Sequence, residues 1–188
     1  MMTLEIVPLS AQDLPGAEDG ILDVYRTAFA SPPYDRQEID VVQFAGGFEW
    51  HAQRPGFRCF VAREGDTILG FTYGYSGAPG SWWYDRVARA LGPGLARPWM
   101  TSAFEFVELA VAPAAQGRGI GGRLHDALLA GLPQRTALLS TAQEETTAQR
   151  LYRRRGWIAL HEHFTFPGGR LPMMIMGLEL ARRRPPPR

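Results

Sequence analysis

The chain has 188 residues, of which 45% are hydrophobic and 21% charged, and its formal net charge is +1. This composition is typical of a single globular domain and argues against nucleic acid as the main partner, because phosphate binding normally needs a basic face. The one cysteine, Cys59, excludes an internal disulfide and predicts a cytoplasmic location. No apolar stretch approaches the ~20 residues of a membrane span, so we expect no membrane partner.

Hydrophobic periodicity predicts the elements of the N-terminal half. Residues 3–9 are predicted to form a strand, residues 17–29 an amphipathic helix and residues 37–52 a weaker helix. Residues 57–63 and 67–76 alternate in polarity on either side of a Glu-Gly-Asp turn signal, which predicts a β-hairpin.

The segment 77–100 is rich in glycine and proline, so we predict a long loop there with one helix over residues 84–91. It carries the aromatic triplet Trp82-Trp83-Tyr84. These side chains pack the loop onto the core, form a homodimer contact, or line a ligand site. The first two interpretations are favoured over the third.

The C-terminal half alternates between strands and helices. Its predicted elements are strands at 104–111 and 136–141, helices at 120–130 and 145–154, and a terminal pair of strands near 157–166 and 173–180. The complete order, β-α-α-β-β-β-α-β-α-β-β, predicts an α/β fold in which a mixed sheet has helices on both faces.

A glycine-rich loop joins the predicted strand 104–111 to the predicted helix 120–130. Glycines allow an anion to approach the main chain where a Cβ would collide. The helix start offers unpaired N–H groups at the positive end of the helix dipole. This combination suits a diphosphate. The candidate cofactor-binding residues are Gln116, Gly117, Arg118, Gly119, Ile120, Gly121 and Gly122.

The spacing of this loop disfavours two common nucleotide-binding loops. A dinucleotide loop reads G-x-G-x-x-G and opens the first βαβ unit, whereas Gln116-x-x-Gly119-x-Gly121 lies past the middle of the chain. A phosphate loop of the NTPase type needs a lysine, and all 20 basic residues here are arginine. A nucleotide-binding oxidoreductase or methyltransferase is therefore disfavoured.

The loop lies between two further motifs, Leu109-Ala110-Val111-x-Pro113 and Ala148-x-x-Leu151-Tyr152-x-x-x-Gly156-Trp157. Together the three resemble the signature of the GNAT superfamily of acetyl-CoA-dependent N-acetyltransferases. The resemblance implies a mixed, mostly antiparallel six- to seven-stranded sheet in one N-acetyltransferase domain (1–180), followed by a flexible basic and proline-rich tail (181–188). It also implies acetyl-CoA as the acyl-donor cosubstrate and a small-molecule or peptide amine as the acceptor.

The resemblance also implies roles for the residues around the loop. Leu109, Ala110 and Val111 would bind the pantetheine arm, and a main-chain N–H of this strand would polarise the thioester carbonyl. Tyr152 would be the general acid, since a phenol of pKa near 10 can protonate a departing thiolate of pKa ~8.5.

Two glutamates of the same strand are candidates for the base. Glu105 matches the position of the base in histone-acetylating members, and burial on its strand face would raise its pKa. Glu108 is the alternative and lies nearer the thioester along the strand. For each, a structural carboxylate paired with an arginine is equally open. No metal site is expected, because the two histidines at 161 and 163 have no evident further ligands.

One departure from the resemblance leaves a second function open. Members of the superfamily often carry an asparagine three residues before the motif alanine, and this chain has Glu145 there. Thr146 or Thr147 would have to replace its contact with the cofactor. A non-catalytic acyl-CoA-binding regulatory module is therefore the alternative. Thr141-x-x-Glu144 is a candidate capping box for the helix that follows.

Overall fold

The computed structural model describes residues 3–169 and 171–180. The described chain forms seven strands, five α-helices and one short 3-10 helix. The bounds are β1 (Leu4–Leu9), α1 (Leu14–Ala28), α2 (Glu38–His51), β2 (Arg58–Glu64), β3 (Thr67–Ser76), α3 (Trp82–Met100), β4 (Ala103–Val111), η1 (Pro113–Ala115), α4 (Ile120–Leu129), β5 (Thr136–Ala142), α5 (Thr147–Arg154), β6 (Ile158–Phe164) and β7 (Met173–Glu179).

The strand order of the sheet is β1-β2-β3-β4-β5-β7-β6. Strands β4 and β5 are parallel, and the pairs β1–β2, β2–β3, β5–β7 and β6–β7 are antiparallel. The prediction of a mixed, mostly antiparallel α/β fold is confirmed.

The described chain divides into two compact units. The first contains residues 3–75 and 107–129, and the second contains residues 76–106, 130–169 and 171–180. Strand β4 passes from the second unit into the first. A single functional domain over residues 1–180 stays a prediction, and the predicted tail at 181–188 lies outside the described residues.

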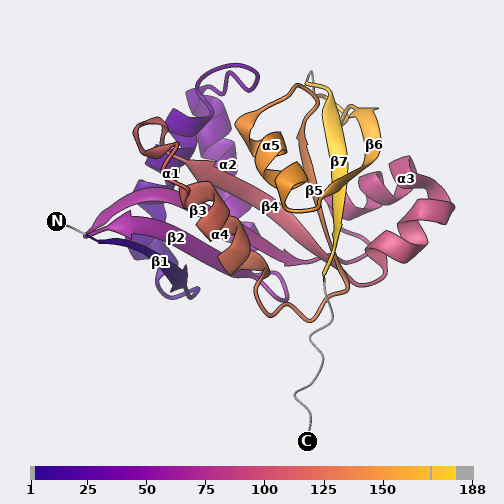
Figure 1. Ribbon diagram of the computed structural model, residues 1–188, viewed down its shortest axis with the longest axis horizontal. Helices are drawn as coiled ribbons and strands as arrows, with labels where there is room; N and C mark the ends of the chain where they lie inside the picture. The colour runs from indigo at the N-terminus through magenta and orange to yellow at the C-terminus, as the bar shows by residue number, and fades with distance from the viewer. Residues whose placement is uncertain (1–2, 170, 181–188) are drawn as a thin grey trace, which may run out of the picture. The chain divides into compact units, whose positions relative to one another are not determined.

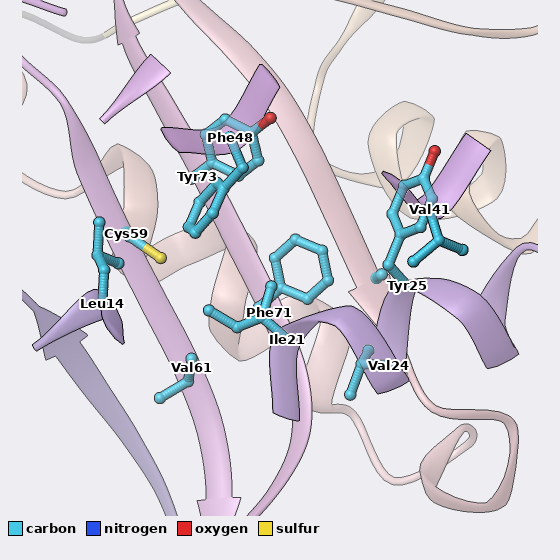
Figure 2. Close-up of a cluster of buried hydrophobic side chains, with 11 residues drawn as sticks. Leu14, Ile21, Val24, Tyr25, Val41, Phe48, Cys59, Val61, Phe71 and Tyr73 are labelled. Carbon is cyan, nitrogen blue, oxygen red and sulfur yellow. The ribbon is translucent and has the colours of Figure 1, made fainter. Parts of the chain in front are cut away.

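In the first unit, α1 and α2 lie on one face of β1–β3 and α4 lies on the other (Figure 1). Alternation along β2 explains this arrangement. Cys59 and Val61 join the cluster under α1 and α2, whereas Phe60 and Ala62 join the cluster under α4. Figure 2 shows the first of these clusters, in which Tyr73 of β3 is enclosed by apolar side chains.

In the second unit, α3 and α5 both pack on the sheet. Leu138 of β5 and Ile175 of β7 are buried in one cluster with Val87 of α3. Tyr152 of α5 instead packs edge-on against Phe106 of β4. The strands of this unit are therefore covered by helices from two different parts of the chain.

The helix predicted over residues 84–91 is confirmed as the first part of α3, whereas the long loop predicted for the rest of 77–100 is wrong. Helix α3 runs through this segment and is interrupted at Gly92, which has φ 68° and ψ 167°. Pro93 follows directly and begins the second helical part, where the missing N–H of a proline breaks no helix bond. Gly92 and Pro93 therefore interrupt α3 instead of forming a long loop. The other predicted elements are confirmed to within three residues at each end.

Candidate active site

The segment between β4 and α4 has the backbone that a glycine-rich anion loop needs. Gly117 and Gly119 have φ angles of 77° and 76°, in the left-handed region that residues with a Cβ rarely adopt. A Cβ added at either position would meet nothing within 4 Å. The backbone conformation therefore requires these glycines, and the space beside them is open.

Helix α4 begins at Ile120, directly after this loop, and the Gly119 carbonyl accepts the N–H of Arg123 at 3.2 Å. The N–H groups of Ile120, Gly121 and Gly122 have no acceptor in the helical ladder. No acidic side chain lies in the first turn of α4, so the positive end of the dipole is not neutralised there. The loop and helix start together fit a diphosphate.

The polar side chains of the loop bond to the protein. Gln116 Nε2 donates to the Val111 carbonyl at 3.1 Å and ties the loop to the end of β4. Arg118 is paired with the Glu64 carboxylate, and Arg123 donates to a main-chain carbonyl of β1 at 3.3 Å. Arg118 would have to leave Glu64 to contact an anion, so its predicted role as a ligand stays a prediction.

The C-terminal part of β4 has an irregular alternation. Leu109 and Val111 pack in the cluster under α4, whereas Ala110 packs in the cluster under α1 and α2. Val107 packs with the cluster of Ala110 and not with that of Leu109, so the alternation of side chains along β4 is interrupted between residues 107 and 109. Glu108 lies between Val107 and Leu109 in β4, and its Oε1 accepts the main-chain N–H of Leu109 at 3.3 Å.

Glu108 is a half-buried carboxylate in the C-terminal part of β4. Burial raises its pKa to about 7, while the Leu109 N–H and the positive charge of Arg36 act in the opposite direction. Burial and the charge of Glu108 raise the pKa of Tyr25 to about 12 and that of Tyr73 well above its ordinary value. The carboxylate therefore lies within electrostatic reach of both hydroxyls. A carboxylate that titrates near pH 7 is a suitable proton acceptor.

Glu105 lies in the second unit and is 3% exposed, so its expected burial is confirmed. The Ser81 hydroxyl donates to Glu105 Oε1 at 3.4 Å. A Cβ added at Gly77 would come within 3.3 Å of the same oxygen. Glu105 is thus closely enclosed, and its role as a base stays a prediction.

Tyr152 lies on the inner face of α5 and is 5% exposed. Its ring centroid is 5.9 Å from that of Phe106 and 5.7 Å from that of Trp157. Its main-chain carbonyl accepts the N–H of Trp157 at 3.2 Å. The predicted motif therefore folds as one packed group, in which aromatic neighbours fix the tyrosine ring.

Two side chains that the sequence analysis did not assign correctly hold α5 in place. Thr146, and not the predicted Thr141, caps the helix, because its side chain accepts the N–H of Gln149 at 3.1 Å. Gln149 is 2% exposed, and its Nε2 donates to the Ala142 carbonyl of β5 at 2.7 Å. The sequence indicates the position of Gln149 by its i, i+3 spacing from Tyr152, which places both side chains on the same face of the helix.

Glu145 occupies the place of the family's asparagine and is exposed. It pairs with Arg150 at 3.5 Å. Thr147 accepts a hydrogen bond from the same guanidinium at 3.1 Å. Thr146 is the helix cap. Glu145, Thr146 and Thr147, which were considered for the asparagine's role, therefore each have a partner in α5.

The aromatic triplet of α3 divides into two roles. Trp83 Nε1 donates to Ser140 Oγ at 3.2 Å, and the Tyr84 hydroxyl donates to a main-chain carbonyl of α3 at 3.1 Å. Trp82 is 52% exposed and stacks on Phe166 at 5.2 Å. Packing on the core therefore accounts for Trp83 and Tyr84.

Other chemistries find little support in the described part of the chain. Within residues 3–169 and 171–180, no three His, Cys, Asp or Glu side chains are grouped as metal ligands. No helix in these ranges has the length and apolar character to cross a bilayer. Burial raises the pKa of the Cys59 thiol to about 12, so it is an inert core residue.

The sheet and the glycine loop define an α/β protein with a loop suited to a diphosphate at a helix start. Residues 21–157 match the Acetyltransferase (GNAT) family. The chain belongs to this family.

Individual relatives agree with the family. Rv2170 of Mycobacterium tuberculosis, a GCN5-like protein acetyltransferase, is 43% identical over 121 residues, which are 60% of this chain and 59% of the relative. The match thus spans about three fifths of that relative's length.

Two solved structures show the same fold. The structure of yncA from Salmonella typhimurium, solved with its cofactor acetyl-CoA, has a TM-score of 0.61 at 16% identity and covers 98% of each chain. The ribosomal-protein-S18-alanine N-acetyltransferase from Escherichia coli has a TM-score of 0.62 at 18% identity, covering 96% of this chain and 97% of the other.

Proposed function

We propose that the protein transfers the acetyl group of acetyl-CoA to a primary amine by direct attack in a ternary complex. The glycine loop at 116–122 carries this proposal, because it combines open space, left-handed glycines and free N–H groups at a helix start. Two relatives support it. The yncA protein was solved with acetyl-CoA, and Rv2170 is named a protein acetyltransferase, which favours a peptide amine as acceptor.

In this proposal the main-chain N–H groups of residues 117–122 hold the diphosphate, and Leu109, Ala110 and Val111 hold the pantetheine arm. The cosubstrate supplies an acyl group activated as a thioester. The Leu109 N–H, which donates to Glu108 in the free protein, is the donor assigned to the thioester carbonyl.

Glu108 is proposed as the proton acceptor for the amine and Tyr152 as the proton donor to the departing thiolate. A pKa of about 7 lets Glu108 be deprotonated at neutral pH and still accept a proton during reaction. Glu105 is the second candidate, and its enclosure by Ser81 and Gly77 favours a structural role.

The proposal is tested by incubating the protein with acetyl-CoA and a panel of amines, including lysine peptides, while free thiol and acetylated product are measured. Because the chain contains no lysine, an acetyl-lysine signal must come from the acceptor. Equal amounts of thiol and product are expected. Thermal stabilisation by coenzyme A without product from any amine would instead support the regulatory acyl-CoA-binding module.

Gly119→Ala is expected to raise KM for acetyl-CoA at least tenfold, a loss of about 1.4 kcal/mol in binding. An alanine at φ 76° is strained, and relaxation would move the N–H groups of the helix start. Gly131→Ala is the matched control, because Gly131 follows α4, has φ 70° and also faces open space. Both variants should lose about 1–2 kcal/mol of stability, but only the first should change KM. Equal KM values in the two variants would contradict the assignment of the loop.

A further inference from the structure

The glycine loop carries an arginine that is already paired with a carboxylate. Arg118 lies between Gly117 and Gly119, and its Nη2 group donates to Oε1 of Glu64, the last residue of β2. The two residues are 54 positions apart in the sequence, and both belong to the first unit. The ion pair therefore joins the loop to the turn between β2 and β3. The chemistry proposed above assigns no role to Glu64.

This ion pair is accessible to a competing anion. The side chain of Arg118 is 44% exposed and that of Glu64 is 25% exposed. Ion pairs that water can reach contribute little to stability, because their charges are screened and two flexible side chains have to be held in one geometry. A guanidinium forms charge-assisted hydrogen bonds to carboxylates and phosphates alike, but a diphosphate offers more negative charge than a carboxylate does. A diphosphate in the loop therefore competes with Glu64 for Arg118.

The shape of the loop is held by bonds that do not use the Arg118 side chain. Before it, Gln116 Nε2 donates to the last main-chain carbonyl of β4 at 3.1 Å. After it, the Gly119 carbonyl accepts the main-chain N–H of Arg123 at 3.2 Å. The positive φ angles of the two glycines beside Arg118 fix the backbone between these bonds. The guanidinium can therefore leave its carboxylate while the main chain of the loop stays in place.

We propose, on the basis of the acetyl transfer proposed above, that Arg118 exchanges between Glu64 in the free protein and the diphosphate of the bound cosubstrate. Because binding has to break the ion pair, Glu64 weakens the binding of coenzyme A. When the product dissociates, the same carboxylate takes the guanidinium back. Glu64 is thus a positioning residue that acts through Arg118 on the affinity and the release of the cosubstrate.

The proposed reaction gives this competition a use. Acetyl transfer changes the thioester and leaves the diphosphate as it was, so each contact to the diphosphate holds the product as firmly as the cosubstrate. Binding energy of this uniform kind does not accelerate the chemical step, and product release limits the turnover of many enzymes. A carboxylate that competes for Arg118 prevents the loop from retaining coenzyme A.

The test measures the dissociation constants of acetyl-CoA and coenzyme A by calorimetry and the dissociation rate of coenzyme A by stopped flow. Glu64→Gln removes the charge and keeps the length and one acceptor oxygen for Arg118. Both ligands should bind about threefold more tightly, the change expected for loss of an exposed ion pair, and coenzyme A should dissociate correspondingly more slowly. Arg118→Gln should weaken binding. Adding Glu64→Gln to Arg118→Gln should then change nothing further, because the carboxylate acts only through the guanidinium.

Glu5→Gln is the matched control. Glu5 of β1 pairs with Arg63 at 3.6 Å, and these side chains are 57% and 43% exposed. Arg63 directly precedes Glu64 in β2, so this variant removes the same charge from a neighbouring ion pair without touching the loop. Its dissociation constants should equal those of the wild type. Acetyl-pantetheine is the ligand control, because this thioester lacks the diphosphate and its KM should be the same in the wild type and in Glu64→Gln.

The sign of the change in Glu64→Gln decides the inference. Unchanged or weaker binding would mean that the ion pair only supports the loop, and the exchange would be overturned. The same gain in Glu5→Gln, or in the Arg118→Gln background, would also overturn it, because the effect would then be one of net charge. A wild-type protein that binds neither acetyl-CoA nor coenzyme A would instead contradict the proposed acetyl transfer.

Discussion

Tyr152→Phe is expected to lower kcat about 100-fold, the lower end of the range for loss of a general acid, and to leave KM for acetyl-CoA within twofold. Phenylalanine keeps the ring that packs against Phe106 and Trp157 and removes only the hydroxyl. The thiolate then departs without a proton. The defect should be measured as steady-state thiol release with saturating acetyl-CoA and acceptor.

Tyr84→Phe provides the control for this loss of a hydroxyl. The Tyr84 hydroxyl donates to the Met100 carbonyl within the second unit, so its removal costs a hydrogen bond of about 1 kcal/mol without touching the proposed chemistry. Its kcat should match that of the wild type. If Tyr152→Phe also retains wild-type kcat, Tyr152 is a packing residue and the thiolate receives its proton from another group.

The fold was predictable where local patterns decide the structure. The hairpin around Gly65 follows from alternation and a turn signal, and the start of α4 follows from glycines that take positive φ. The segment containing α3 was not predictable in the same way. Its second helical part begins at Pro93, and whether a proline starts a helix or ends one depends on packing against strands that are distant in the sequence.

The candidate site was likewise predictable only where its residues belong to local motifs. The loop and Tyr152 belong to contiguous motifs, so their neighbours were partly foreseeable. The choice between Glu105 and Glu108 depended on an interruption of strand alternation and on side chains from α1, α2 and β3. Likewise, Glu64 and Arg118 are 54 positions apart in sequence, and no local spacing indicates their contact. Contacts between segments that are distant in the sequence determine the surroundings of these residues.

Glu108→Gln is expected to change the pH dependence of kcat/KM and to lower its value about 100-fold or more at pH 8. In a plot of log(kcat/KM) against pH, deprotonation of an alkylamine acceptor of pKa near 10.4 contributes a slope of one from pH 5 to pH 9. Deprotonation of Glu108 adds a second unit below its pKa of about 7. The wild-type slope should therefore be two below pH 7 and one above it. The Gln variant should show a slope of one throughout.

Two further variants assign this transition to a residue. Arg36 lowers the pKa of Glu108, so Arg36→Gln should move the change of slope to a pH above 7. Glu105→Gln should leave the change of slope in place, because the transition belongs to Glu108. A transition that persists in Glu108→Gln and disappears in Glu105→Gln would reverse the assignment of the base.

The stability of Glu108→Gln gives a readout that does not depend on activity. The folded pKa of Glu108 is raised from 4.5 to about 7, so the folded state binds the proton more tightly than the unfolded state. The contribution of Glu108 to wild-type stability is then greatest below pH 4.5 and decreases as pH rises to 7, by up to about 3 kcal/mol. The uncharged variant lacks this decrease. Urea unfolding should therefore show Glu108→Gln gaining stability relative to the wild type between pH 5 and pH 8, and a constant difference would mean that Glu108 is not a buried, titrating carboxylate.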